Sequence, residues 1–221
     1  MEHRLTDPVQ QLTGVGERRA ALYRKLGVKT IYDLLTLYPR TYLDLSHPLP
    51  ILETVLGETN VIRATVYRKQ GEQRIRKGLS LYKVFVTDGL SNLTVTIFNS
   101  KYMFDSLEEN QDYLFYGKVT GTLLRREMHS PLCFPGQEEA LIRPVYPLTE
   151  GLSNKLVQSH VREALKVWGD RLTDDLPLAI RREQSLCQLR YAVENIHFPT
   201  DAQALQIARK RLVFEELLIL Q

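Results

Sequence analysis

The sequence lacks the features that mark several large classes of protein. It has only two cysteines among 221 residues, too few for a disulfide framework, and a reducing compartment suits them. No run of 18 apolar residues occurs, so the sequence predicts no transmembrane helix. The charged start Met1–Arg4 has no apolar stretch behind it, unlike a secretory signal peptide. These absences favour a protein of the cytoplasm.

The sequence also lacks the motifs that carry common enzymatic chemistry. A P-loop for ATP needs two glycines at a fixed spacing, followed by Lys and then Ser or Thr. The only Gly-Lys pair, Gly117-Lys118, has Asp112 in place of the first glycine and Val119 in place of the hydroxyl residue. The five histidines stand apart from one another and from both cysteines, which does not fit a metal site. We therefore expect no catalytic residue, no metal ligand and no cofactor site in this chain itself.

What is present is typical of a folded globular protein. Hydrophobic residues make up 43% of the chain and charged residues 25%, and the length suits one large or two small domains. The net charge of +3 is mildly basic, which is compatible with nucleic-acid binding but not diagnostic of it.

Two regions of the chain have helical periodicity. In residues 8–40 apolar side chains recur every three or four positions, with a break at Gly27 and a stop at Pro39. A second helical region follows Ser153, a predicted N-cap, and its last helix stays apolar to Leu220-Gln221 without a stop signal. One interpretation of this ending is a C-terminal helix docked on the core. The pattern favours the other, a chain cut within a helix that continues in a larger protein.

Residues 60–121 have the alternation of β-strands instead. In the clearest stretch, Leu93–Phe98, every second residue is apolar and faces the same way. A short helix is predicted over Lys101–Glu109 and a last strand within Glu139–Val145. We expect an α+β fold, in which an OB-type five-stranded Greek-key barrel is flanked by N-terminal and C-terminal helices. The expected domains are a helical region and linker at 1–57, the OB domain at 58–150 and a helical region at 151–221.

Three features of the sequence are candidates for contact with nucleic acid. The first is the turn Leu12–Gly16, whose two glycines resemble a helix-hairpin-helix turn. Its backbone amides at a helix start would bind a phosphate without reading bases. The alternative is a tight turn whose glycines only allow two helices to pack closely, and the sequence does not separate the two.

The second feature is a local excess of positive charge. Residues 63–83 contain seven cations and a single acid, Glu72. The polar connection 70–78 could lie along a DNA backbone as the tip of a hairpin, or it could be an ordinary solvated loop. Six cations are candidates for contact with the DNA backbone, of which the last lies outside this stretch: Arg68, Lys69, Arg74, Arg76, Lys77 and Lys101.

The third feature is a pair of aromatic residues, Phe98 and Tyr102. Phe98 ends a strand on the face opposite to its apolar residues, and Tyr102 follows four positions later beside Lys101. Two aromatic rings and a cation on an OB surface are the parts of a platform for stacking bases. The alternative is that both rings cover the open end of the barrel.

Several short runs, in this order, resemble one known family. They are Leu12–Gly16, Asp33–Leu35, Tyr38–Tyr42, Phe98-Asn99, Gly117–Val119, Pro144–Leu152, Ile196–Pro199 and Ala208–Leu218. Together they are similar to the N-terminal part of the RecG family of bacterial branched-DNA helicases, over nearly all of the chain. The runs Pro144–Leu152 and Ala208–Leu218 are the most specific.

This resemblance implies a role that composition alone does not. It implies an OB-fold wedge that binds replication forks and four-way junctions, in DNA repair, recombination and the rescue of stalled forks. Phe98 and Tyr102 match the wedge aromatics that stack on bases at the branch. ATP and magnesium would serve the motor domains of the parent helicase, whose motifs this chain lacks. The resemblance further implies a bacterial, nucleoid-associated monomer, with single-strand binding protein as a candidate partner.

Two other functions stay open at this point. The barrel could be a protein-interaction module that docks a partner protein through its aromatic face. It could also bind single strands of DNA or RNA with no preference for branches.

Overall fold

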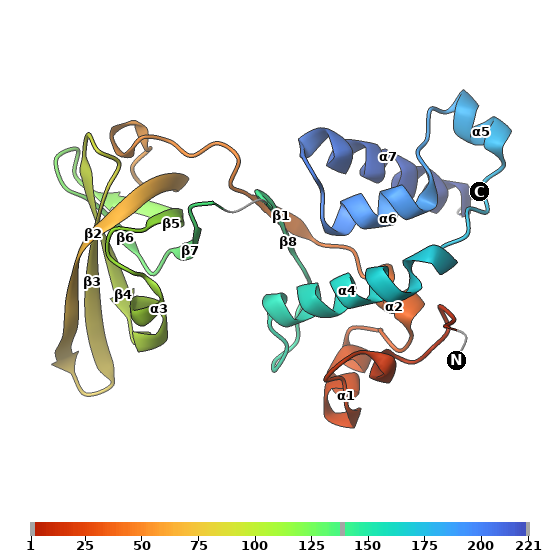
Figure 1. Cartoon of the computed structure of the whole chain (residues 1–221), viewed down its shortest axis with the longest axis horizontal. Coiled ribbons are helices and arrows are strands. Elements are labelled where there is room, and N and C mark those ends of the chain that lie inside the picture. The colour runs from red at the N-terminus through yellow and green to blue at the C-terminus, as the bar shows by residue number, and fades with distance from the viewer. Residues whose placement is uncertain (1–2, 138–139, 220–221) are drawn as a thin grey trace. The chain divides into compact units, whose positions relative to one another are not determined.

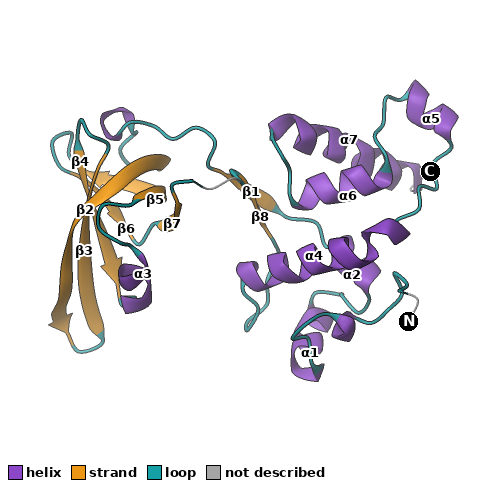
Figure 2. Cartoon of the chain, viewed as in Figure 1, coloured by secondary structure: helices purple, strands orange, loops and turns teal. Residues whose placement is uncertain are grey.

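The computed structural model describes residues 3–137 and 140–219 of the chain. The chain divides into two compact units: residues 1–44 with 140–221, here called the helical unit, and residues 45–139, the barrel unit. Figure 1 labels the elements of both, and Figure 2 shows that most strands belong to the barrel unit. The two helical segments at the ends of the chain therefore contribute to one unit.

The barrel unit is a six-stranded sheet with one short helix, α3 (Lys101–Ser106), between its third and fourth strands. Its strands are β2 (Thr59–Arg76), β3 (Leu79–Thr87), β4 (Asn92–Phe98), β5 (Asp112–Gly121), β6 (Arg126–His129) and β7 (Leu132–Pro135). Five of them pair in a ring, in the order β2-β3-β4-β6-β5 and back to β2, while β7 pairs with β5. The β4–β6 pair is parallel and the others are antiparallel. This is the order of an OB-type Greek-key barrel, which confirms the predicted fold class.

The alternation predicted for Leu93–Phe98 produces the barrel core. Leu93, Val95 and Ile97 are buried, whereas Phe98 at the end of β4 is exposed. The other strands of the ring contribute Ile62, Val84, Phe115 and Met128, among others, to the same apolar cluster. The core therefore accounts for one face of β4 and leaves Phe98 outside it.

The strand that completes the ring differs from the predicted one. The segment Ile142–Val145 (β8) pairs with Thr41–Asp44 (β1) in the helical unit, so the strand predicted within Glu139–Val145 is not part of the barrel. Its place is taken by Arg126–His129, a segment with no predicted strand. Of its two buried side chains one is an arginine, so this short run lacks the apolar alternation on which the prediction depended. The predicted helix over Lys101–Glu109 also ends earlier, at Ser106.

The helical unit packs its helices around a second apolar core. They are α1 (Glu17–Lys25), α2 (Ile31–Leu35), α4 (Asn154–Trp168), α5 (Leu178–Glu183), α6 (Leu189–His197) and α7 (Ala202–Ile219). Local caps define two of the starts. Thr30 and Asp33 form a capping box at α2, and Ser153 accepts a hydrogen bond from the Leu156 amide, which confirms the predicted cap. None of the described residues forms a helix that is both long and apolar enough to cross a membrane.

The same core contains charged and polar side chains that are fully buried. The Arg211 side chain pairs through Nη2 with Asp174 Oδ1 at 2.8 Å and with Glu215 Oε1 at 2.6 Å. The ring of His197 lies between the Tyr146 hydroxyl, 2.9 Å from Nδ1, and the Leu35 carbonyl oxygen, 2.8 Å from Nε2. Both ring nitrogens of His197 thus have partners within the unit. The Arg211 guanidinium is paired through Nη2 alone, and its buried Nε and Nη1 have no hydrogen-bond partner among the described residues.

Candidate nucleic-acid interface

The outer half of the β2–β3 hairpin is a basic projection of the barrel unit. β2 pairs with β5 only from Thr59 to Thr65, and beyond that point it pairs with β3 alone. Every residue from 71 to 78 is exposed, and Lys77-Gly78 forms the turn, with Gly78 in the left-handed region at φ +81°. The connection 70–78 is therefore largely β-strand and not a free loop (Figure 1). Its cations are attached to a main chain of regular, hydrogen-bonded structure.

The six predicted backbone cations divide by what they touch, and two are engaged within the unit. The Arg68 guanidinium lies over the Phe85 ring, 4.1 Å from its centroid. The Lys69 ammonium donates a 2.5 Å hydrogen bond to the Leu107 carbonyl oxygen and lies 4.2 Å from the centroid of the Phe104 ring. Both side chains have a structural role that a sequence-based charge count does not reveal.

The remaining four cations lie near the end of the hairpin and on α3. Arg74, Arg76 and Lys77 are exposed, and none of the ion pairs found among the described residues includes them. Lys101 is paired with Asp105 at 2.5 Å, and this contact raises the pKa of its ammonium group. Three exposed, unpaired cations on one hairpin attract a polyanion more strongly than cations that already have partners.

The two predicted stacking residues both reach the surface. Phe98 is 38% exposed, and its ring makes a T-shaped contact with the His129 ring, with centroids 5.8 Å apart. Tyr102, on the first turn of α3, is 83% exposed. A tyrosine this exposed covers no core, so the alternative in which both rings cover the end of the barrel does not describe Tyr102.

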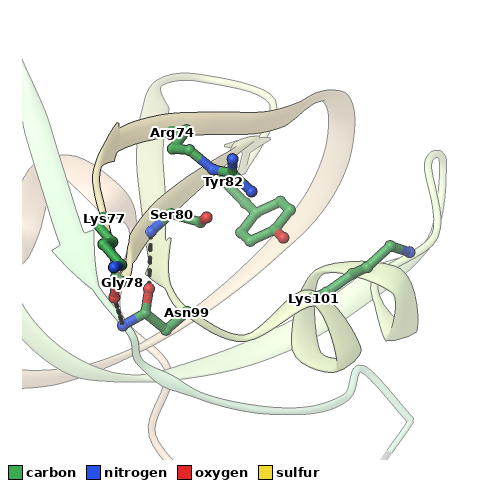
Figure 3. Close-up of a pocket in the computed structure, with 7 residues that line it drawn as sticks. All are labelled: Arg74, Lys77, Gly78, Ser80, Tyr82, Asn99 and Lys101. Atoms are coloured by element: carbon green, nitrogen blue, oxygen red, sulfur yellow. Dashed lines mark hydrogen bonds between the residues drawn. The ribbon is translucent and has the colours of Figure 1, made fainter.

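A single asparagine joins the hairpin to the segment that carries these rings. Asn99 follows Phe98 and adopts φ +51°, a left-handed conformation in which asparagine is enriched. Its Oδ1 accepts from the Ser80 amide at 2.8 Å and its Nδ2 donates to the Gly78 carbonyl oxygen at 3.1 Å (Figure 3). Its own amide donates to the Ser80 carbonyl oxygen at 3.0 Å. The hairpin turn and the Phe98 strand end are thus held together by three hydrogen bonds.

In the sequence, Asn99 belongs to the family run Phe98-Asn99, and this resemblance predicts no role for it. A signal was available, because an asparagine between a strand end and Ser100, which caps α3, is a common choice for a left-handed residue. Its partners Gly78 and Ser80 lie about 20 positions earlier, so the bridge itself depends on the pairing of three strands. Ser80 and Tyr82, which lie beside it, were not singled out either.

The glycine turn in the helical unit already holds an anion of the chain's own. The Thr13 amide donates to both carboxylate oxygens of Glu163 on α4, at 3.0 and 3.2 Å, and the Thr13 hydroxyl donates to Oε1 at 2.8 Å. Arg19 donates to the Gly14 carbonyl oxygen at 2.5 Å. This geometry favours the reading in which the turn packs helices, because a carboxylate of the chain occupies the amide that a phosphate would need.

Other ligand chemistry finds little support in the part of the chain that the structure describes. Within residues 3–137 and 140–219, no three His, Cys, Asp or Glu side chains are grouped so that they could hold a metal ion. The basic hairpin with its aromatic neighbours is the arrangement that best fits a ligand.

Comparison with known proteins decides the family. The family model described as the RecG wedge domain matches residues 8–167, well over half of the chain. The chain belongs to the RecG family. The ATP-dependent DNA helicase RecG of Thermotoga maritima is 28% identical over 98% of this chain and 28% of its own length. The Escherichia coli RecG helicase is 30% identical over 99% of this chain and 33% of its own length.

A solved structure agrees with the same assignment. The structure of RecG bound to a three-way DNA junction covers 99% of this chain and 31% of its own, with a TM-score of 0.83 and 26% identity. The predicted resemblance to RecG is thus confirmed. The chain spans about a third of the length of the RecG proteins that it matches.

Proposed function

We propose that this RecG chain is a wedge that binds branched DNA at forks and four-way junctions and helps to separate its strands. The observation that carries the proposal is the exposure of Phe98 and Tyr102 at the same end of the barrel as three unpaired cations of the β2–β3 hairpin. The likeness to RecG bound to a three-way junction supports it.

The proposed mechanism follows from the chemistry of these side chains. Separating paired strands removes base stacking, which costs a few kcal/mol for each extruded base. A base that stacks on an exposed aromatic ring regains about 1–3 kcal/mol. Arg74, Arg76 and Lys77 would hold the phosphate backbone without reading sequence, so recognition is of DNA shape.

The double variant Phe98→Ala/Tyr102→Ala tests the stacking role. We expect a preference for a fork over linear duplex to fall about tenfold or more, since two stacked bases lose their platform, while nonspecific binding persists. Fluorescence anisotropy with matched fork and duplex, at several salt concentrations, measures this. Tyr32→Ala is the control, because that ring is 52% exposed but lies in the helical unit.

Two results would contradict the proposal. A double variant that still discriminates forks as well as the parent chain would remove the stacking assignment. If the preference for forks is absent from the start, and single strands compete equally well, the protein is a general single-strand binder. Binding of a protein partner that survives high salt would instead favour the protein-docking function, with single-strand binding protein as the first partner to try.

The residues around Gly117-Lys118 do not match the P-loop pattern that binds ATP phosphates. We propose that ATP and magnesium serve the parts of RecG helicases that lie outside the region matched by this chain. Monomeric state and an association with the bacterial nucleoid are parts of the same proposal, to be tested by sedimentation and by localisation of the full-length protein.

A further inference from the structure

A pocket of about 550 Å³ lies between the hairpin turn and the start of α3. Seven residues line it, and none of them is acidic (Figure 3). They are Arg74, Lys77, Gly78, Ser80, Tyr82, Asn99 and Lys101. The pocket thus collects three of the cations discussed above around one space.

The walls of this pocket come from two segments that Asn99 connects. Arg74 and Lys77 belong to the hairpin, whereas Lys101 belongs to α3. Asn99 ties the hairpin turn to the β4 end by its hydrogen bonds to Gly78 and Ser80, and Ser100 then caps α3 through the Met103 amide. The backbone segments that carry the cations of the two walls are therefore linked to each other through Asn99 and Ser100.

Two residues that line the pocket lie next to the two aromatic residues in the sequence. Phe98 and Asn99 are neighbours, and so are Lys101 and Tyr102. A DNA strand whose bases stack on the two rings has its phosphates close to those rings, because each stacked base and its phosphate belong to the same nucleotide. The pocket is near such phosphates, since Asn99 and Lys101, which line it, are the chain neighbours of the two rings.

We propose that this pocket is a subsite for a phosphodiester group of the strand that stacks on Phe98 and Tyr102, and that Asn99 is its positioning residue. The proposal rests on the proposed function and goes further, since it assigns the phosphate to one place on the barrel. It also separates Arg74 and Lys77, which line the pocket, from Arg68 and Lys69, which do not.

Two carboxylates engage the pocket in the free protein. Asp105 pairs with Lys101, and the Ser80 hydroxyl donates to Glu72. At Lys101 a bound phosphate competes with Asp105 for the ammonium group, whereas Arg74 and Lys77 have no carboxylate partner among the described residues. The hairpin cations should accordingly contribute more to binding than Lys101 does.

The first experiment places single uncharged methylphosphonate linkages, one at a time, near the branch of a fork. For the parent chain we expect one linkage beside the stacked bases to weaken binding at least threefold. In the variant Arg74→Gln/Lys77→Gln the same linkage should have no further effect, and the slope of log K against log salt should fall by about 0.7 for each lost phosphate contact. Lys118→Gln/Arg125→Gln is the control, because both cations are exposed on the same unit outside the pocket.

Equal weakening of the parent and the variant by every linkage would overturn the subsite. If branch preference still depends on Phe98 and Tyr102 in that case, the proposed function stands and only the subsite fails. If the two rings also prove irrelevant, both fail together.

The second experiment replaces Asn99 by glycine, which tolerates the left-handed backbone but removes both side-chain hydrogen bonds. Asn110→Gly is matched to it, because Asn110 is exposed and has φ +65°. We expect Asn99→Gly alone to lose the methylphosphonate effect, while quenching of 2-aminopurine by the aromatic rings persists. A purely structural role would lower the stability of the barrel unit yet leave the linkage effect intact, and that result would remove the positioning role of Asn99.

Discussion

Two regions of this RecG chain, the core of the helical unit and the β2–β3 hairpin of the barrel unit, use charged side chains in opposite ways. In the helical unit Arg211 is fully buried and pairs with Asp174 and Glu215. In the barrel unit Arg74 and Arg76 are exposed, and neither takes part in an ion pair among the described residues. Arg211 has its ionic partners within the fold, whereas Arg74 and Arg76 have none in the described part of it and are available to a ligand.

Four aromatic side chains of the two units show the same contrast. Tyr23 and Tyr146 of the helical unit are buried, with their hydroxyl groups 2.7 Å from His160 Nδ1 and 2.9 Å from His197 Nδ1. Phe98 and Tyr102 of the barrel unit reach solvent. Substitutions in the core of the helical unit should therefore change stability, and those at Phe98, Tyr102 and the hairpin cations should change binding.

The largest expected effect is on the stability of the helical unit. Arg211→Met leaves Asp174 and Glu215 without their buried partner, although Arg181 still contacts Asp174 at 3.2 Å. Breaking such a pair costs about 3–5 kcal/mol. Trp168 is the only tryptophan and lies in this unit, so its fluorescence in urea measures the loss there alone. Arg190→Met, at an exposed ion pair, is the control and should leave the urea midpoint unchanged. Equal midpoints for the two variants would contradict the expected difference between a buried and an exposed ion pair.

The pH dependence of that stability comes next in size. Burial lowers the pKa of His197 from 6.5 to about 4, so the folded unit binds this proton less readily than the unfolded chain. Stability is therefore fully present above pH 6.5 and is lost as pH falls toward 4, by about 3 kcal/mol for this shift. Urea unfolding followed through Trp168 between pH 7.5 and 4.5 measures it. His197→Gln should flatten the profile, and an unchanged slope in that variant would assign the effect to other groups, of which His160 has a pKa lowered in the same direction.

The sequence predicted the features that local pattern determines. The alternation in Leu93–Phe98 placed three residues in the core and Phe98 outside it, and the OB class followed from the number of strands. Sequence alone could not predict the pairing of Thr41 with Val145, because partners about 100 positions apart leave no mark in a local window. The role of Phe98 and Tyr102 in stacking stays a prediction.

The sequence alone also could not predict which basic residues contact other parts of the fold and which do not. Lys69 and Arg74 look alike in the sequence, five positions apart in one basic stretch. Lys69 has a structural role only because the chain brings the Leu107 carbonyl oxygen to it from 38 positions away. Composition therefore identified the basic stretch but could not separate the cations that contact the fold from those that have no partner in the described part of it.

A smaller effect tests this division within the barrel unit. Lys69→Gln removes the hydrogen bond to Leu107 and the contact with Phe104, and we expect a loss of about 1 kcal/mol in stability. The salt dependence of DNA binding should not change. Arg76→Gln should do the reverse, with unchanged stability and a salt slope reduced by about 0.7–0.9. Amide hydrogen exchange of the barrel strands and anisotropy titrations measure the two properties, and the same outcome for both variants would erase the distinction.

The smallest expected effect is a gain of affinity. Asp105→Asn removes the carboxylate that pairs with Lys101 and leaves that ammonium group free for a phosphate. Both side chains are largely exposed, so water screens their contact and the gain should be only about two- to fivefold at low salt. Anisotropy titrations with a fork measure it, and Glu108→Gln serves as a control that removes an equal charge from an exposed site just after α3. Equal gains in affinity from both variants would attribute the effect to net charge. A gain from Asp105→Asn alone would show that Lys101 contacts a DNA phosphate and that its ion pair with Asp105 weakens this contact.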